Sequence, residues 1–183
     1  QEDRACLAVH LWINQSGRLL RHKFSRALMR SAARLTYTKT QAAFEGQKTD
    51  LSKDFIKTVI SPLYGAYKSL CVERDKRGPL DLDMPEERIY LDEKGQVAKI
   101  APRPRLNSHR LIEEFMILAN VAAAIELETR QHLCMYRVHD EPSLEKVDAL
   151  REFLKGFDLS LPKGQAIRPK IFNHILEKAK ESP

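Results

Sequence analysis

The chain has 183 residues and a formal net charge of +6, and its residues are 43% hydrophobic and 31% charged. This composition fits one globular domain with a hydrophobic core, and it excludes fibrous, disordered and membrane-embedded classes of protein. The longest apolar run, 115–125, is too short to cross a bilayer, and three widely spaced cysteines favour a reducing cytoplasm over a disulfide scaffold or a zinc site.

The first predicted elements are two strands that form a hairpin. The segment 6–13 is rich in residues that favour strands, 14–17 is a cluster of turn residues, and 18–29 follows as the returning strand. The alternation in the second strand is imperfect, which also allows a helix from Ser25 onward. Trp12, in the first strand, is predicted to be a core residue rather than a surface for stacking.

A short helix and a long helix are predicted next. Thr38 is placed to cap a short helix that ends near Gly46. Ser52 begins a longer helix, in which apolar residues recur at helical spacing. Pro62 falls inside this pattern, so we expect a kink or a later start. The polar segment 73–79 ends the helix.

A second hairpin follows the long helix. Its strands are predicted at 88–91 and 96–100, with Gly95 well placed for a positive φ in the turn between them. Just before it, Asp81 and Asp83 alternate and would share one face of a strand. Two carboxylates without a third ligand are weak evidence for a metal site, so a solvated hairpin edge is the favoured interpretation.

The most apolar predicted helix is capped by Asn107 or Ser108 and runs to about Arg130. Apolar residues cover nearly its whole circumference, so we expect it to be mostly buried. It nevertheless holds two adjacent carboxylates, Glu113 and Glu114, in or near its first turns. The helix dipole favours carboxylates there, where they often face water. In a sharper hypothesis, one of them faces a cleft and accepts a hydrogen bond from a ligand hydroxyl.

The last third of the chain is predicted to hold one strand and two helices. The strand is 133–138, the first helix begins at Pro142 and ends at Gly156, and the second follows Pro169. The fold class is therefore α+β, with two β-hairpins and a further strand packed with about five helices.

Basic residues dominate the first quarter of the chain. Between positions 4 and 44 there is no Asp or Glu, whereas arginine and lysine recur throughout. Such a surface attracts phosphate chains, because binding releases their counterions. A solvated basic face without a ligand would have the same composition, and charge alone does not separate the two.

Four stretches of the chain resemble one family, in the family's own order. They are "ARLTYTKTQ" (33–41), "RGPLDLDMPE" (78–87), "NSHRLIEEFMILANVAAA" (107–124) and "MYRVHDEPSLEKVDALREFL" (135–154). The resemblance is to the middle of the RNB catalytic domain of ribonucleases II and R, and it is closer to ribonuclease R. It implies that residues 1–183 are the central part of a single RNB catalytic domain, truncated at both ends.

The resemblance implies a processive 3′→5′ exoribonuclease that hydrolyses single-stranded RNA to nucleoside 5′-monophosphates. The family's chemistry uses Mg²⁺ held by aspartates that precede this region, and an arginine motif close to "SPIRRY" that follows it. Neither motif is present here, so we expect no catalytic residue and no metal ligand in this chain, which alone should be inactive. The expected partners are single-stranded RNA and the rest of the same polypeptide on both sides. The alternatives are a non-catalytic RNB-like module that binds RNA or a protein, and a basic domain without a ligand.

Three residues are assigned to RNA binding through the resemblance. Tyr37, in "RLTY", matches a family tyrosine near the 3′-terminal nucleotides, and Arg34 of the same motif is grouped with it. Glu113 matches a family glutamate that contacts ribose, whereas Glu114 has no assigned role. A phenol and a carboxylate can both bond a 2′-hydroxyl, which DNA lacks. One departure is that the family's base-stacking phenylalanine has no aromatic counterpart near 81–83.

Overall fold

The computed structural model describes residues 2–80, 82, 86–162 and 168–180. The chain divides into two compact units, one of Gln1–Glu73 with Met84–Cys134 and one of Arg74–Asp83 with Met135–Pro183. The predicted α+β class is confirmed, because the described residues form two antiparallel hairpins and five helices when the continuous helix from position 53 to position 77 is counted once. No helix in this described part is long and apolar enough to cross a membrane.

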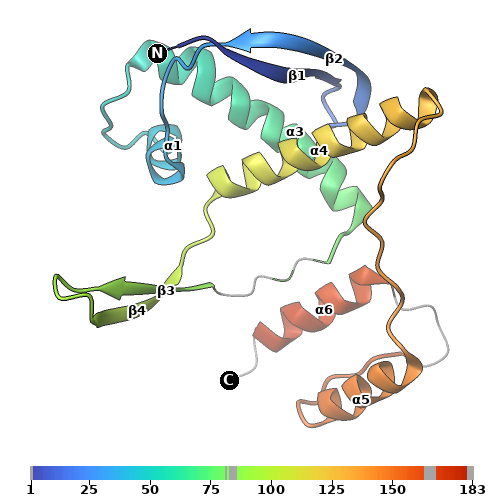
Figure 1. The fold of residues 1–183 in the computed structure, drawn as a ribbon. Helices are drawn as coiled ribbons and strands as arrows, with labels where there is room; N and C mark the ends of the chain where they lie inside the picture. Colours follow the sequence, from blue (N-terminus) through green and yellow to red (C-terminus); the bar gives the residue numbers. More distant parts are fainter. Residues whose placement is uncertain (1, 81, 83–85, 163–167, 181–183) are drawn as a thin grey trace. The chain divides into compact units, whose positions relative to one another are not determined.

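The first hairpin pairs β1 (Arg4–Ile13) with β2 (Leu19–Met29) in antiparallel register. The second strand stays extended to its end, which rules out the helix that the sequence allowed from Ser25. In the turn, Gly17 has a φ of +82°, and a Cβ there would stand 2.1 Å from the backbone oxygen of Ser69 in the long helix. Glycine therefore lets the hairpin turn lie directly against that helix. We call these two strands the ribbon (Figure 1).

Trp12 is not a core residue, contrary to the prediction. Its side chain is 36% exposed, and the guanidinium carbon of Arg21 on the paired strand lies 3.9 Å from the centre of its ring. A two-stranded ribbon has only two faces, and α4 (Asn107–Thr129) lies against the other one. The apolar composition of the strand suggested burial, but Trp12 falls on the face that is not covered by any helix of the described residues.

The short helix α1 (Tyr37–Phe44) begins two residues earlier than predicted. Thr36, not Thr38, is its N-cap, and its hydroxyl oxygen accepts a hydrogen bond from the backbone N–H of Lys39 at 3.2 Å. The helix ends just before Gly46, which has a φ of +79°, as the sequence predicted.

The long helix contains a π-helical turn. Ser52 caps α2 (Lys53–Phe55), as predicted, and this short piece continues through η1 (Ile56–Ile60) into α3 (Ser61–Arg77). The irregular turn stands directly before Pro62, which has no N–H to donate to the preceding turn. The predicted perturbation at Pro62 therefore takes the form of a π turn, a recognised way for a helix to accommodate such a residue.

The second hairpin pairs β3 (Glu86–Leu91) with β4 (Val97–Arg103), and Gly95 in its turn has a φ of +76°, as predicted. The helix α4 then runs close to its predicted length, but Leu106 is the N-cap in place of Asn107 or Ser108. The backbone N–H of Leu106 donates to Nδ1 of His109 at 3.1 Å. This bond satisfies the N–H of Leu106, whereas the N–H of Ser108 in the first turn donates to the side-chain oxygen of Gln41 at 3.1 Å.

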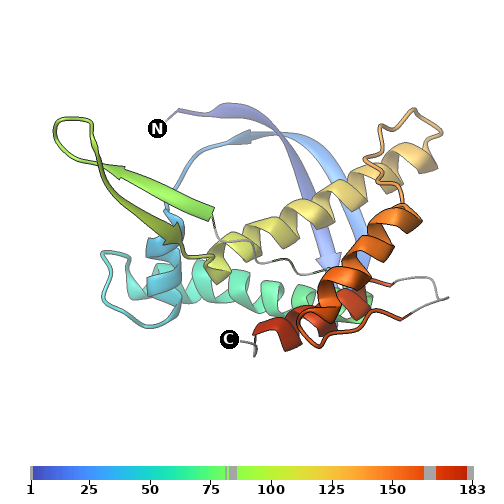
Figure 2. The same ribbon diagram turned by 90° about the horizontal axis from the view of Figure 1, so that it is seen from below.

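The core of the first unit is an aromatic cluster between α1, the long helix and α4. Its buried residues are Ile60, Tyr64, Tyr67 and Leu111, and Phe44 stacks on Tyr64 with ring centroids 3.7 Å apart. Figure 2 shows α1 beside the start of α4 and the long helix, with the ribbon crossing the two long helices.

The helix α4 is less buried than predicted. Only four of its residues are buried, whereas five apolar residues are exposed: Ile112, Met116, Ile117, Val121 and Ile125. Its apolar circumference predicted contacts on all sides, but the described residues cover one side only.

The second unit contains α5 (Leu144–Lys155) and α6 (Pro169–Lys180), close to the two predicted helices. They share an aliphatic cluster of buried residues: Val147, Leu154, Leu161 and Ile175. The predicted strand 133–138 is wrong, because this segment lies outside helices and strands and pairs with no strand in the described part of the chain. Its β-forming residues have no neighbouring strand to satisfy their backbone groups, so they remain without regular structure.

Candidate functional site

Tyr37 is fixed at the junction of α1 and α4. It is the first residue of α1, and its carbonyl oxygen accepts a hydrogen bond from the hydroxyl of Ser108 at 2.9 Å. Its ring stacks on His109, with centroids 4.1 Å apart and planes inclined by 26°. Nδ1 of His109 accepts a hydrogen bond from the backbone N–H of Leu106 at 3.1 Å. Hydrogen bonds at the start of α4 therefore hold the backbone of Tyr37 and the ring of His109, and the Tyr37 ring rests on the His109 ring.

Glu113 lies one helical turn beyond His109 on the same stripe of α4. Its side chain is 48% exposed, and its Oε2 accepts a hydrogen bond from the guanidinium of Arg105 at 2.7 Å. An exposed ion pair of this kind adds only about 0–1 kcal/mol of stability. Its effect is rather to hold the carboxylate beside a positive charge.

Glu114 is the buried member of the pair, at 5% exposure. The account of both carboxylates as water-facing residues of the first turn is therefore wrong for Glu114. The helix begins at Asn107, so the pair falls in its second turn, and Glu114 follows Leu111 on the side that packs into the core. A buried carboxylate needs partners inside the protein. The two acids therefore have different environments: Glu113 lies at the surface and Glu114 lies in the interior.

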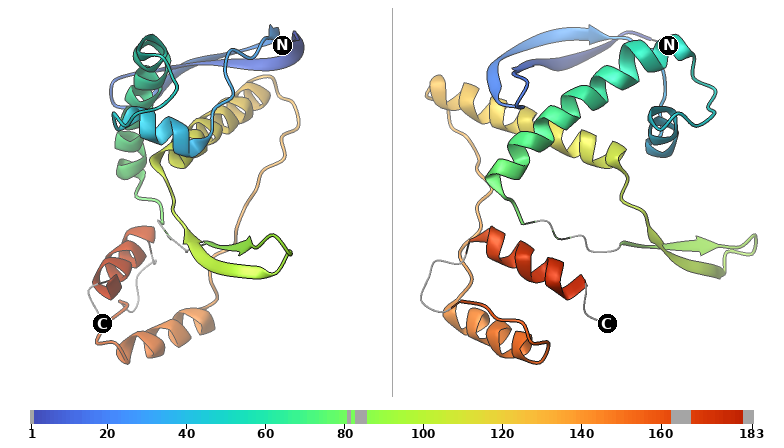
Figure 3. Two further views of the ribbon diagram at one scale, coloured as in Figure 1. Left: turned by 90° about the vertical axis from the view of Figure 1, so that its left-hand side faces the viewer. Right: turned by 180° about the vertical axis from the view of Figure 1, so that it is seen from behind.

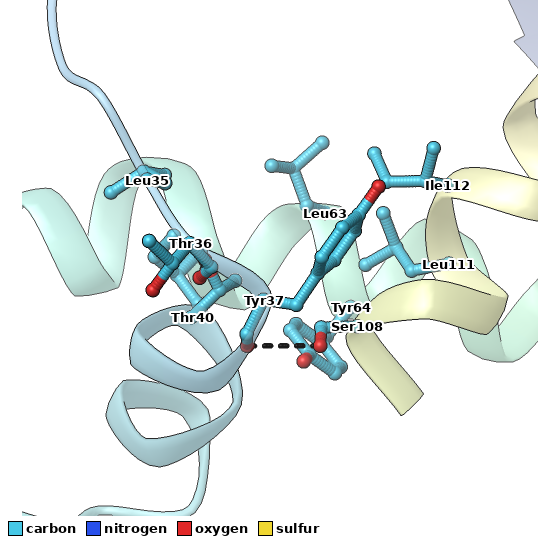
Figure 4. Close-up of a pocket in the computed structure, with 10 residues that line it drawn as sticks. Leu35, Thr36, Tyr37, Thr40, Leu63, Tyr64, Ser108, Leu111 and Ile112 are labelled. Carbon is cyan, nitrogen blue, oxygen red and sulfur yellow. Dashed lines mark hydrogen bonds between the residues drawn. The ribbon is translucent and has the colours of Figure 1, made fainter. Parts of the chain in front are cut away.

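A cavity of about 270 Å³ lies beside Tyr37 (Figure 4). The figure shows the tyrosine ring extending across it, with the hydroxyl directed toward Ile112. The volume falls just under the range of about 300–1,000 Å³ that is usual for small-molecule sites, so the cavity suits a single ring rather than a whole cofactor. The residues that line it are mainly apolar: Leu35, Thr36, Tyr37, Thr40, Ile60, Leu63, Tyr64, Ser108, Leu111 and Ile112.

Gln41 ties the three helices around this cavity together. Its buried side-chain oxygen accepts hydrogen bonds from the hydroxyl of Tyr64 at 3.0 Å and from the backbone N–H of Ser108 at 3.1 Å. Burial raises the pKa of the Tyr64 hydroxyl, which therefore stays protonated as a donor. Gln41 was not predicted from the sequence, because nothing in "TKTQAAF" distinguishes a buried glutamine from an exposed one.

The remaining assigned residue, Arg34, is exposed on the segment before α1 and does not line the cavity. The structure therefore brings Tyr37 and the stripe of Glu113 together through His109, and it leaves Arg34 apart from them. Asp81 and Asp83 lie outside the described residues. Among the residues that are described, no group of three or more His, Cys, Asp or Glu is arranged to hold a metal ion.

The chain matches known proteins along its whole length. Residues 1–183 match the RNB domain. Ribonuclease R of Escherichia coli (strain K12) is 34% identical over 185 residues, which are 100% of this chain and 23% of that protein. Ribonuclease R of Aquifex aeolicus (strain VF5) is 36% identical over 179 residues, which are 96% of this chain and 25% of that protein.

Solved structures share the fold. The apo form of Mycoplasma genitalium RNase R has a TM-score of 0.88 at 22% identity, over 100% of this chain and 29% of that one. The same protein in complex with ribose methylated single-stranded RNA gives the same values. The family match covers every residue of the sequence, and this chain therefore belongs to the RNB domain family.

Proposed function

We propose that this chain is the central, RNA-contacting part of an RNB exoribonuclease, which degrades single-stranded RNA from its 3′ end and releases nucleoside 5′-monophosphates. The curated relatives that carry the name Ribonuclease R support this activity for the longer protein. The observation that carries the proposal is that Tyr37, which lines the apolar cavity, stacks on His109, one helical turn before Glu113.

In this proposal, Glu113 recognises ribose. A carboxylate is an acceptor only, so it pairs with a 2′-hydroxyl that donates, and DNA offers no such donor. Its bond to Arg105 uses one oxygen and places a cation nearby. The cation offsets the repulsion between the carboxylate and the phosphates of the strand, which would otherwise oppose binding.

The rings of Tyr37 and His109 serve the base of the same nucleotide. Tyr37 is 42% exposed, so a base has access to it, and His109 supports its ring from one side. Stacking of a base on an aromatic side chain contributes about 1–3 kcal/mol in single-strand binding. The complex of Mycoplasma genitalium RNase R with ribose methylated single-stranded RNA supports a ligand of this class.

Hydrolysis itself is assigned to groups outside this chain. In the intact enzyme, Mg²⁺ would activate water and offset charge on the phosphate, and the aspartates expected to hold it precede this region. The residues described here then act by position: they hold the ribose and the base of a strand so that its phosphate meets the metal site.

A comparison of two neighbouring substitutions tests the ribose site. The dissociation constants of a labelled ribo-oligonucleotide and its deoxy counterpart are measured for the chain and for Glu113→Ala and Glu114→Ala. Glu113→Ala should reduce the preference for ribose roughly tenfold, because a hydrogen bond to a charged group is worth about 1.5–3 kcal/mol. The free energy of unfolding should change by at most about 1 kcal/mol, the upper limit for the exposed ion pair with Arg105.

Glu114→Ala is the matched control, because it removes the buried neighbour. It should lower the free energy of unfolding by at least about 1 kcal/mol, since it strands the partners of a buried carboxylate, and it should preserve the ribose preference of the folded protein. If the two variants behave alike in both measurements, the assignment of Glu113 is wrong. With Mg²⁺ and a 3′-tailed RNA, this chain alone should release no mononucleotide, and robust release would contradict the placement of the metal ligands outside it.

A further inference from the structure

One face of the ribbon carries aromatic and cationic side chains and no carboxylate. In the strand register, His10 stands opposite Lys23 and Trp12 stands opposite Arg21. Paired residues and residues two apart on a strand share a face, so these four side chains form one surface. All four are exposed. We call this surface, made of His10, Trp12, Arg21 and Lys23, the outer ribbon face.

The ribbon is held so that this face points away from α4. On the opposite face, Nε2 of His22 lies 3.0 Å from Oε2 of Glu126 in α4, and the His22 side chain is only 13% exposed. Gly17 fixes the turn against Ser69 of α3, with no room for a larger residue. Figure 3 shows both strands lying across α3 and α4. The outer ribbon face is therefore a fixed surface rather than a mobile hairpin.

The aromatic side chains of this face form a stack with the guanidinium of Arg21. The Arg21 guanidinium carbon lies 3.9 Å from the centre of the Trp12 ring, and the His10 ring lies 5.9 Å from that ring with the planes inclined by 26°. Three planar groups thus lie in sequence across the two strands. Guanidinium and aromatic planes of this kind are surfaces on which nucleic-acid bases stack.

Among the described residues, the positive charge of this face has no acidic partner. No carboxylate in the described part of the chain pairs with Arg21 or Lys23. No Asp or Glu occurs between positions 4 and 44 either, so both strands and the segment that follows them are free of negative charge. A contact between Trp12 and Arg21 alone would be explained as a cross-strand pair that stabilises the ribbon. It would not require Lys23 and His10 on the same surface without an acidic partner.

We propose that the outer ribbon face binds single-stranded RNA, with Arg21 and Lys23 on its phosphates and a base stacked against the Trp12 group. The inference rests on the proposed function, in which RNA is the ligand, but it concerns a surface separate from Tyr37 and Glu113. An acidic protein surface would meet the same cations. The stack of planar groups favours RNA, because an acidic peptide makes no use of it.

Trp12 is the only tryptophan of the chain, so its fluorescence reports directly on this face. The chain is titrated with an oligouridylate of about 12 nucleotides, within the site sizes of single-strand binders. We expect quenching that saturates and weakens with added salt. Polyglutamate serves as the acidic protein probe and should cause no saturable quenching. Binding of RNA without a change in Trp12 emission, or equal quenching by polyglutamate, would overturn the proposal.

Substitutions on the two faces of β2 give a matched comparison. The double variant Arg21→Gln/Lys23→Gln should bind RNA at least about fivefold more weakly. The slope of log K against log salt concentration should become shallower by about 1.4, because each phosphate that the variant no longer binds contributes about 0.7. Arg26→Gln removes a cation that stands opposite Leu7 on the other face, and it should change both quantities far less. Equal effects of the two variants would show a general charge effect and reject the site.

The test separates this inference from the proposed function. Loss of ribose preference in Glu113→Ala is measured by comparing the binding of ribo- and deoxy-oligonucleotides. RNA binding at the outer ribbon face is measured by the change in Trp12 fluorescence. If Glu113→Ala acts as expected and Trp12 does not respond, the outer ribbon face fails and the ribose site stands. Trp12→Leu should bind labelled RNA more weakly. Circular dichroism of this variant should confirm that it is folded. Unchanged binding by the folded variant would exclude stacking on Trp12.

Discussion

The two hydrophobic clusters of this chain are built differently. The aromatic cluster around Tyr64 contains polar atoms, because a phenol, a glutamine and a backbone amide meet at its edge. The aliphatic cluster of α5 and α6 is formed by Val147, Leu154, Leu161 and Ile175. Apolar contacts are non-directional, whereas hydrogen bonds fix orientation. The aromatic cluster can thus hold Tyr37 and Ser108 in one geometry, and the candidate site lies where the directional bonds are.

The largest expected effect comes from Tyr64→Ala. Tyr64 is 1% exposed and stacks on Phe44, so truncation should cost about 3–5 kcal/mol of unfolding free energy. Trp12 lies in the same unit, and its emission during urea unfolding is the measurement. Leu154→Ala in the other unit should cost about 2–5 kcal/mol without moving the Trp12 transition. Equal shifts of that transition in both variants would show that the clusters unfold as one.

Gln41→Leu should have an intermediate effect. The substitution keeps the side chain's approximate volume but leaves the Tyr64 hydroxyl and the Ser108 N–H without their acceptor, which costs about 1–3 kcal/mol. RNA binding should weaken as well, because Ser108 holds Tyr37. Gln47→Leu, at an exposed position nearby, is the control and should stay within about 0.5 kcal/mol. Similar losses of unfolding free energy in both variants would contradict a stabilising role for the hydrogen bonds of Gln41 in the aromatic cluster.

The smallest effect is a pH dependence at the ribbon. Hydrogen bonds from Arg130, and then from His22, hold the pKa of Glu126 below its ordinary value of 4.5. A carboxylate with a lowered folded pKa contributes stability above its unfolded pKa and loses it as the pH falls through the folded pKa. Unfolding followed by Trp12 should therefore become easier below pH 4.5, and Glu126→Gln should flatten this dependence. Glu152→Gln, at an exposed position of α5, should leave the pH dependence unchanged. An unaltered pH dependence in Glu126→Gln would contradict the role of the Glu126 hydrogen bonds.

Local signals predicted most of the elements. Both hairpins, the Ser52 cap and the positive φ of Gly95 depend on a few adjacent residues, so the sequence was sufficient for them. The predicted cap of α4 was wrong. Asn107 and Ser108 looked suitable because they are polar, but Leu106 is the N-cap and its N–H donates to the side chain of His109 within the helix. The segment 133–138 has the composition of a strand but lacks a partner in the described part of the chain, which composition does not encode.

The assignment of Tyr37 and Glu113 to RNA binding stays a prediction, and the arrangement of the two residues could not be predicted from the sequence. Tyr37 and Glu113 were assigned through a family resemblance, and the structure places them on one row through His109, whose role the sequence did not indicate. The division between Glu113 and Glu114 depends on which side of α4 meets Leu111. The helical pattern was apolar nearly all round, so it contained no signal for that choice.

The π turn at Ile56–Ile60 acts as a phase adjustment between two lengths of helix. A π turn takes in one more residue than an α turn, and each residue of an α-helix advances by about 100°. The residues before it are thus rotated relative to those after it, and Phe55 and Ile56 reach the same cluster as Ile60 and Tyr64. The one additional residue therefore determines which side of the preceding helix faces the core. A homologue without it would need a different set of apolar positions before Pro62 to fill the same core.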